Sequence, residues 1–489
     1  MKRFLWLGCV LSLYLMCSGC GETFRPIILP NPPTFPNPSA AHSVVSINDN
    51  GSVVVGSSMV IDVSGDSNVS VVNTDIHSVY GAQATASEIL VVNQAVTGLN
   101  VPTTACLVTV GNQVFNVCPS LTLLNFSGTV IGSTNTVTLP IYSSPNFVAV
   151  APGASTAYVT LPTYPPDPTN PQTVLPSVAV VSTQSRSVIA TIPVVANPAA
   201  NANPYSLAVT PDNAKLYVAD NSAPCGNPAN GICSITAFNT VDRSSRGING
   251  SLSSPPIWMS ARTDSQAVYV LEASGALAYI SITSTAGPDT LIEDPAITVP
   301  SAVKMTYDGN LSRLYIPGGT EVEIVDVSQA APAPIATIPI TAISPSVRGA
   351  TDPCSTTAIA TLHTIDVAAL PDGSRAYAGS YYEDASDNIC PQVTVIDAVS
   401  NTIKTVIAVP GFAAYDAFCS TTRFRLTMAP GGDSSRAYLA SCDGGMVNII
   451  DTFTDSYILN QQEPASTRNT NPPGPQNFPQ NPVFMLAGP

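Results

Sequence analysis

The stretch Pro371-Asp372-Gly373-Ser374-Arg375-Ala376-Tyr377-Ala378 decides the fold of this 489-residue chain, because it is repeated. It recurs as PDNAKLYV at Pro211–Val218 and, with one extra residue, within Pro430–Leu439. Each copy places a turn of the Pro-Asp-Gly type before a strand that carries a tyrosine. Weaker copies centre on three further tyrosines, and a degenerate copy has leucine in the tyrosine position: Tyr158, Tyr269, Tyr315 and Leu90.

The residues around each hairpin predict four short strands per repeat. In the clearest copies an alternating strand such as Tyr205–Thr210 precedes the turn, and a third strand such as Val393–Val399 and a fourth such as Thr402–Ile407 come later. The tyrosine positions recur at intervals of 46 to 68 residues. Four-stranded units at this period are typical of β-propeller blades, which bury their faces by packing around an axis. A series of separate β-sandwiches would lack the shared hairpin.

The fold class is therefore all-β, a β-propeller of four-stranded antiparallel blades. Seven tyrosine positions predict seven blades, with Met59–Val63 and Asn68–Val72 as third and fourth strands that complete the last sheet. The tail Asn481–Leu486 is expected to join the same blade, so that pairing of the N- and C-terminal strands closes the ring. Eight blades result if Ser43–Val72 forms a shortened repeat of its own.

The hairpin, a following V-x-V-I-D strand and a T-x-x-V-I-A-x-I strand resemble the YVTN family of bacterial β-propellers. The resemblance covers most of Val44–Ser456 and is strongest in the repeats of Tyr217, Tyr377 and Tyr438. It implies the propeller fold but not one activity, since this broad group includes surface antigens, lactonase-like enzymes and propeller domains of haem and copper reductases.

The N-terminus predicts export. Lys2 and Arg3 precede the apolar run Phe4–Met16, which is short for a membrane span and typical of a signal peptide. The following Cys17-Ser18-Gly19-Cys20 resembles a bacterial lipobox, which implies a signal peptide over 1–19 and a lipid on Cys20. An ordinary cleaved signal is the alternative. Gly21 in place of Asp favours the outer membrane, on its periplasmic or surface side.

The expected domains are a tether over 20–42 and a propeller over 43–489, with a Pro/Asn/Gln-rich segment at 460–482 before the last strand. Arg25–Pro38 has proline at six of fourteen positions and favours an extended, semi-rigid spacer. The net charge is −15, with 32 acidic residues against 17 basic ones. A surface this negative repels phosphate backbones and argues against nucleic acid as a partner.

Eight cysteines remain beyond Cys20, and an even number in an exported chain predicts disulfides. None forms a C-x-x-C motif, which argues against redox, haem and zinc-ribbon sites. In a propeller, the loops between second and third strands share a face with the connections between blades, so all eight are expected on one face. Sequence alone permits 105 connectivities, and neighbourhood on that face favours the pairs Cys106–Cys118, Cys225–Cys233, Cys354–Cys390 and Cys419–Cys442.

The sequence offers no catalytic constellation, so no catalytic, metal or cofactor residues are assigned. His42, His77 and His363 are scattered and are interpreted as solvated or satisfied residues. Asp212, Asp308 and Asp372, and likewise Asp326, Asp397 and Asp451, recur in register and are interpreted as turn and strand-end hydrogen-bonding residues.

Aromatic residues in the loops of the cysteine-bearing face are the binding candidates, and packing at the bases of long loops is the alternative. The candidate ligand face comprises Tyr142, Tyr205, Trp258, Tyr381, Tyr382 and Tyr415. The leading hypothesis is a monomeric, non-catalytic binding protein of the cell envelope, with an envelope protein or a glycan as partner. The alternatives are a lactonase-like hydrolase or lyase that uses the central channel, and a spacer without a ligand.

Overall fold

The computed structural model describes residues 43–49, 51, 55–96, 105–141, 143–151, 153, 155–162, 176–194, 203–221, 235–282, 288–355, 359–414, 417–458 and 480–488. The chain divides into two compact units, Met1–Asn31 and Pro32–Pro489, and every described residue belongs to the second. Cys20, the expected signal peptide and the whole of the expected tether therefore lie outside the described residues. None of the described helices is long and apolar enough to cross a membrane.

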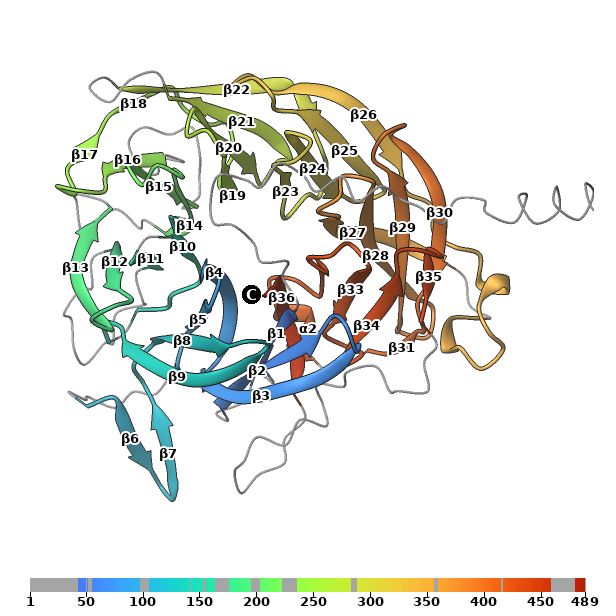
Figure 1. The fold of residues 1–489 in the computed structure, drawn as a ribbon, viewed down its shortest axis with the longest axis horizontal. Helices are drawn as coiled ribbons and strands as arrows, with labels where there is room; N and C mark the ends of the chain where they lie inside the picture. The colour runs from blue at the N-terminus through green and yellow to red at the C-terminus, as the bar shows by residue number, and fades with distance from the viewer. Residues whose placement is uncertain are drawn as a thin grey trace, which may run out of the picture. The chain divides into compact units, whose positions relative to one another are not determined.

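The described strands form eight antiparallel blades around a common axis (Figure 1). The first four blades, each given from the innermost strand outward, are β36 (Asn481–Ala487), β1 (Ser43–Asp49), β2 (Val55–Asp62) and β3 (Ser67–Ile76); β4 (Ser78–Thr85), β5 (Glu88–Asn93), β8 (Ser120–Ser127) and β9 (Val130–Thr138); β10 (Val148–Val150), β11 (Thr156–Leu161), β12 (Ser177–Ser182) and β13 (Ser187–Pro193); and β14 (Pro204–Val209), β15 (Lys215–Asp220), β16 (Ile235–Asn239) and β17 (Ser245–Arg246).

The other four blades follow in chain order. They are β19 (Pro256–Ala261), β20 (Ala267–Glu272), β21 (Ala276–Ser281) and β22 (Asp289–Thr298); β23 (Thr306–Asp308), β24 (Arg313–Gly318), β25 (Glu321–Asp326) and β26 (Ala333–Pro339); β27 (Ile359–Ala369), β28 (Arg375–Asp384), β29 (Asn388–Asp397) and β30 (Thr402–Ala408); and β32 (Leu426–Pro430), β33 (Arg436–Ser441), β34 (Met446–Asp451) and β35 (Ser456–Tyr457).

A few short elements lie outside this pattern. β18 (Ile248–Asn249) adds to β22 in parallel, β31 (Phe412–Ala413) pairs with β29, and β6 (Leu107–Val110) and β7 (Gln113–Asn116) form a hairpin between β5 and β8 that projects from the ring in Figure 1. The described helices are η1 (Pro345–Val347), η2 (Pro353–Ser355) and α2 (Ala417–Thr421).

The described residues form eight blades, so the fold-class prediction is confirmed with its eight-blade alternative and not with seven blades. The last repeat has its own fourth strand, the two-residue β35, and does not need the N-terminal strands. Instead β1, β2 and β3 form a separate blade, in which β36 is the innermost strand. The predicted closure is confirmed, because β36 from the C-terminal end pairs antiparallel with β1, from Val44 opposite Ala487 to Asp49 opposite Asn481.

Three of the repeated tyrosines, Tyr217, Tyr377 and Tyr438, connect one blade to a carboxylate of the next. Each tyrosine lies on the second strand of its blade and is buried. The Tyr377 hydroxyl donates to Asp455 Oδ1 at 2.6 Å, and the Tyr438 hydroxyl donates to Asp66 Oδ1 at 3.1 Å. In both cases the acceptor belongs to the turn between the third and fourth strands of the following blade. Tyr217 bonds Asp289 of the next blade in the same way, at 2.7 Å.

A basic residue two positions before the tyrosine pairs with the same carboxylate. Lys215 Nζ lies 2.7 Å from an Asp289 oxygen, Arg375 Nε 3.2 Å from an Asp455 oxygen, and Arg436 Nε 2.9 Å from an Asp66 oxygen. We call each basic residue, tyrosine and acceptor an inter-blade latch. The latch to Asp66 joins the last repeat to the N-terminal blade and so closes the ring.

The recurring aspartates have the structural roles expected of them. Asp212 Oδ1 accepts the Ala214 amide at 3.0 Å, and Asp372 Oδ1 accepts the Ser374 amide at 2.9 Å. Asp397 Oδ1 likewise accepts the amide of Val399 at 3.0 Å. Asn213 and Gly373 follow the first two aspartates with φ of 54° and 68°, in the left-handed region that asparagine and glycine adopt most readily. These carboxylates stabilise their own turns.

Candidate functional site

Two recesses lie on the axis, one at each face of the ring. The larger, about 740 Å³, is lined by segments from all eight innermost strands, including Pro211, Asn310 and Pro430 at their distal ends. The smaller, about 500 Å³, lies where innermost strands begin, between Ser78 of β4, Tyr205 of β14 and Val483 of β36. We call these the turn-face recess and the disulfide-face recess.

A closed ring of aromatic side chains separates the two recesses. Ring centroids lie 4.3 Å apart for Tyr80–Phe147, 5.3 Å for Phe147–Trp258, 5.9 Å for Trp258–Phe424, 5.9 Å for Phe424–Phe484 and 4.5 Å for Phe484–Tyr80. All five side chains are buried. The central channel is therefore filled with side chains at this level, and a ligand can enter it only from one face or the other.

The ion pair of Lys304 and Asp366, beside the turn-face recess, makes several contacts within the fold. Lys304 Nζ lies 2.7 Å from Asp366 Oδ2, which also accepts the Met428 amide at 2.9 Å, while Asp366 Oδ1 accepts the Val367 amide at 2.8 Å. The ammonium group also lies over the rings of Trp258 and Phe484. This pair joins three adjacent blades, and both carboxylate oxygens of Asp366 already accept hydrogen bonds within the fold.

The disulfide-face recess takes its wall from the segment around α2. Phe418, Thr421, Thr422 and Arg423 all line it, and the Cys419–Cys442 disulfide ties this segment to the end of β33. Gly51, which also lines the recess, has φ of 69°, and a Cβ there would overlap the Phe418 ring. Only glycine permits this close approach, so the segments of Gly51 and Phe418 pack directly against each other.

Arg423 is the principal cation of the disulfide-face recess. Its Nη2 donates to the Ile257 carbonyl at 2.9 Å, and its Nη1 is enclosed without a hydrogen-bond acceptor. Four aromatic rings surround the guanidinium, with Tyr205 nearest at 4.3 Å from its centroid. Within the described part of the chain no carboxylate forms an ion pair with it. Burial lowers the pKa of Arg423, and an arginine remains charged even so.

A histidine and an aspartate lie on the other side of the same recess. Asp49, at the end of β1, places Oδ2 3.3 Å from His77 Nδ1, and both residues line the recess. His77 connects β3 to β4 with φ of 56°, an uncommon conformation for a residue other than glycine. His77 therefore contacts a carboxylate and lines the recess, which its isolated position in the sequence did not indicate.

The predicted aromatic ligand face is not a single exposed surface. Trp258 lies in the aromatic ring on the axis and is 6% exposed, and Tyr382 is fully buried. Tyr205 lines the disulfide-face recess. Tyr381 is half-buried and stacks on His363, with centroids 5.2 Å apart. Tyr142 and Tyr415 lie outside the described residues, as does His42.

Three of the four expected disulfides are present: Cys106–Cys118, Cys354–Cys390 and Cys419–Cys442. Cys106–Cys118 lies within a loop between second and third strands, and Cys419–Cys442 joins an inter-blade connection to another such loop. Cys354–Cys390 joins an inter-blade connection to the start of the third strand β29, since Cys390 belongs to that strand and not to the loop before it. All three lie on the face where innermost strands begin. Cys225 and Cys233 lie outside the described residues.

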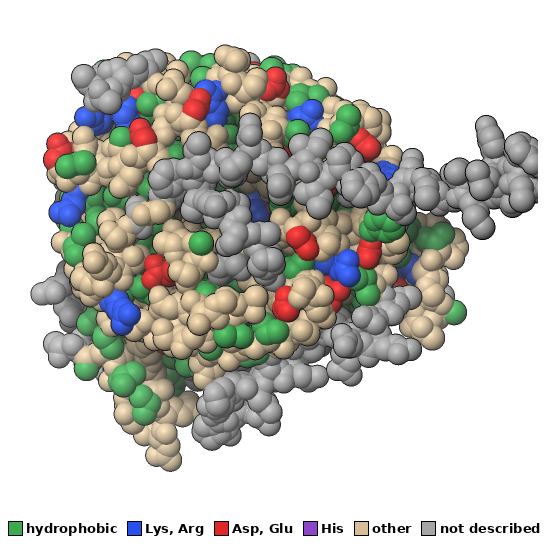
Figure 2. Space-filling model, in the orientation of Figure 1, with side chains coloured by type: hydrophobic (Ala, Val, Ile, Leu, Met, Phe, Trp, Pro, Cys, Tyr) green, Lys and Arg blue, Asp and Glu red, His purple; other side chains and the backbone are tan. Residues whose placement is uncertain are grey.

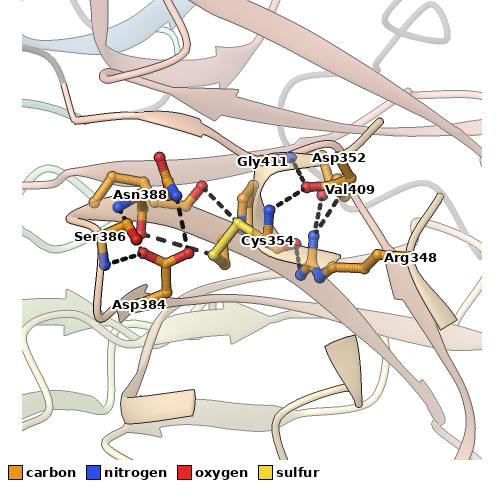
Figure 3. Close-up of a disulfide and its surroundings, with 11 residues drawn as sticks. Arg348, Asp352, Cys354, Asp384, Ser386, Asn388, Val409 and Gly411 are labelled. Atoms are coloured by element: carbon orange, nitrogen blue, oxygen red, sulfur yellow. Dashed lines mark hydrogen bonds and ion pairs between the residues drawn. A yellow bond between two sulfur atoms is a disulfide. The ribbon is translucent and has the colours of Figure 1, made fainter. Parts of the chain in front are cut away.

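The Cys354–Cys390 disulfide lies within a hydrogen-bonded loop cluster (Figure 3). Asp352 Oδ1 accepts the amides of Cys354 and Gly411, at 2.9 and 3.2 Å, and Arg348 donates to the Val409 carbonyl at 2.8 Å. Asp384 also lies near both sulfur atoms. Because the sulfur atoms are bonded to each other, they offer no thiolate to a metal, and the cluster is structural.

The charged side chains on the face in view do not mark a second candidate site. Figure 2 shows basic and acidic side chains scattered over the face in view, and among the residues drawn in colour neither sign gathers into a large patch. Three residues of the disulfide-face recess were not predicted to form a site: Asp49 and Arg423 were not singled out in the sequence, and His77 was interpreted as a solvated or satisfied residue. Asp49 ends the strand β1, whereas His77 and Arg423 lie in two different connections between blades, and none of the three belongs to a sequence motif.

Comparisons with known proteins agree with the architecture. No family model and no curated protein matches the chain. Among solved structures, apo AztD from Citrobacter koseri is 10% identical, with a TM-score of 0.54 over 91% of this chain and 97% of that one. The dihydro-heme d1 dehydrogenase NirN, solved in complex with DHE, is also 10% identical, with a TM-score of 0.54 over 95% of this chain and 79% of that one. At this identity the likeness concerns the fold alone, and the chain is similar to these proteins as a β-propeller.

Proposed function

We propose that the protein is an exported, lipid-anchored β-propeller that binds a small ligand with an acidic group in the disulfide-face recess. The single observation that carries this proposal is Arg423. Removing a guanidinium from water is costly unless it is paired, and contacts with aromatic faces offset only part of that cost. An acidic group in the recess would supply the missing partner.

The form of the recess supports a small ligand. About 500 Å³ is within the range of small-molecule sites, and polar groups are set among apolar walls such as Val79 and Val483. The disulfide at Cys419 is four residues from Arg423 and ties its segment to β33. A wall held in place in this way lowers the ordering cost of binding.

The disulfides also support the expected location. Structural disulfides persist in oxidising compartments, which is consistent with export through the signal at residues 1–19 and anchoring by a lipid on Cys20. An envelope protein or a glycan as a further partner remains a prediction, as does the monomeric state.

The test uses N-acetyl-L-leucine, a small carboxylate, and the fluorescence of Trp258. Trp258 lies 5.2 Å from the Arg423 guanidinium and is the sole tryptophan beyond residue 31. We expect the probe to change this fluorescence saturably, and Arg423→Met to weaken binding about tenfold or more. Arg243→Met is the matched control, because it removes an exposed arginine outside the recess. Equal binding by Arg423→Met and the control would refute the proposal.

A second candidate function follows from His77 and Asp49. With Nδ1 against the carboxylate, His77 can present Nε2 as a general base to a water molecule in the recess. Water would attack an ester carbonyl while His77 takes its proton, and the protonated His77 would then give that proton to the leaving alkoxide, so that an acid and an alcohol are released. Hydrolysis of p-nitrophenyl acetate that is lost in His77→Gln would favour this hydrolase, whereas equal rates for both proteins would exclude it.

A further inference from the structure

The carboxylate of Asp49 lies at the disulfide-face recess, and one of its two oxygens has no hydrogen-bond donor. The residue is 3% exposed and lines the recess at the end of β1. Oδ2 faces His77 Nδ1 at 3.3 Å, whereas Oδ1 is enclosed and accepts no hydrogen bond. No lysine or arginine among the described residues pairs with it. A buried carboxylate oxygen without a donor costs free energy that a donor on a ligand would recover.

Asp49 and Arg423 face the same recess without forming an ion pair with each other. They come from different parts of the chain, the end of the second strand of one blade and the segment before the first strand of its neighbour. Opposite charges that line one cavity but do not neutralise each other are complementary to a ligand that carries both signs. An acidic ligand alone would satisfy Arg423 and be repelled by Asp49.

The walls between the two charges fix their placement. Gly51, two residues after Asp49, packs beneath Phe418, five residues before Arg423. The Cys419–Cys442 disulfide ties the Arg423 segment to β33, and pairing with β36 holds Asp49 opposite Asn481. Both charges are therefore held before a ligand arrives, which favours a ligand of fixed charge spacing.

We infer that the ligand of the disulfide-face recess is a zwitterionic amino-carboxylate, such as a free α-amino acid, with its carboxylate at Arg423 and its ammonium group at Asp49. This inference rests on the proposed function and deepens it. Tyr205 and Val483 offer aromatic and apolar surface for the remainder of such a ligand.

The first test compares three probes by Trp258 fluorescence on the full chain: L-leucine, N-acetyl-L-leucine and L-leucinamide. N-acetyl-L-leucine lacks the ammonium group and L-leucinamide lacks the carboxylate. We expect L-leucine to bind about tenfold or more tightly than either. If N-acetyl-L-leucine binds as tightly as L-leucine and its binding depends on Arg423, the inference of a zwitterionic ligand is wrong while the proposed function stands. If none of the three binds, both fail for this class of ligand.

The second test uses Asp49→Asn, which keeps the size of the side chain and removes its charge. We expect Asp49→Asn to weaken the binding of L-leucine about tenfold or more. The binding of N-acetyl-L-leucine should be unchanged or tighter, because the substituted side chain no longer repels its carboxylate. A folding defect would weaken both probes, so this opposite response separates a binding role from a structural one. Equal weakening of both probes overturns the inference, as does an unchanged affinity for L-leucine.

Discussion

Ring closure through the Tyr438–Asp66 latch gives the sharpest stability prediction. Tyr438→Phe removes a buried hydroxyl that donates to Asp66 Oδ1 at 3.1 Å. A hydrogen bond to a charged group contributes about 1.5–3 kcal/mol, and a length of 3.1 Å is long for an O–H donor. Asp66 keeps Arg436 as a partner at 2.9 Å, so its carboxylate is not left unpaired. We therefore expect a loss of about 1–2 kcal/mol in the free energy of unfolding.

Tyr315→Phe is the matched control for this latch. Tyr315 occupies the same position in its own blade and is equally buried, but its hydroxyl makes no hydrogen bond. Its removal should change the free energy of unfolding by less than about 0.5 kcal/mol. Urea unfolding followed by circular dichroism measures both variants. Equal costs for the two substitutions would refute the idea that the tyrosine hydroxyl connects the blades.

Three further predictions concern disulfides, pH and anchoring. Replacing Cys354 and Cys390 together by serine opens a loop with a sequence separation of 36 and should cost about 3–4 kcal/mol, measured by urea unfolding; a loss below about 1 kcal/mol would contradict a structural role. Burial and the nearby Glu293 raise the pKa of Glu272 to about 7, above its value in the unfolded chain, so Glu272 lowers stability as pH rises from about 4.5 through 7. The gain in the free energy of unfolding of Glu272→Gln over the wild type should therefore be larger at pH 8 than at pH 5, by about 1–2 kcal/mol. Thermal unfolding that shows the same difference between variant and wild type at both pH values would exclude this. Cys20→Ala should release the protein from the membrane fraction, whereas retention in that fraction would rule out a lipid on Cys20 as its anchor.

The blades were predictable because their signals are local and repeated. The Pro-Asp-Gly turn, the left-handed residue at Gly373 and the buried tyrosine of the second strand all lie within eight residues. The blade count depended on features without such signals. β1 carries no tyrosine, and β35 consists of only two residues. The pairing of β36 with β1 joins opposite ends of the described chain, yet it could be expected because a propeller needs closed edges.

The recess was not predictable from the sequence, although its face was. The propeller architecture placed the cysteines on one face, and the Cys419–Cys442 disulfide near Arg423 lies there. The side chains that line the recess come from several blades and from the connections between them. The conformation of these connections has no repeated sequence signal, so it could not be predicted. The sequence also could not show which loop aromatics are buried: Trp258 packs on the axis, whereas Tyr205 lines the recess.

Native mass spectrometry of the protein purified from its own envelope tests most directly whether the disulfide-face recess holds a small ligand through Arg423. The wild-type protein and the Arg243→Met control are predicted to carry a small adduct that Arg423→Met lacks. An adduct of equal occupancy in all three proteins, or none in any of them, would contradict a ligand held by this arginine.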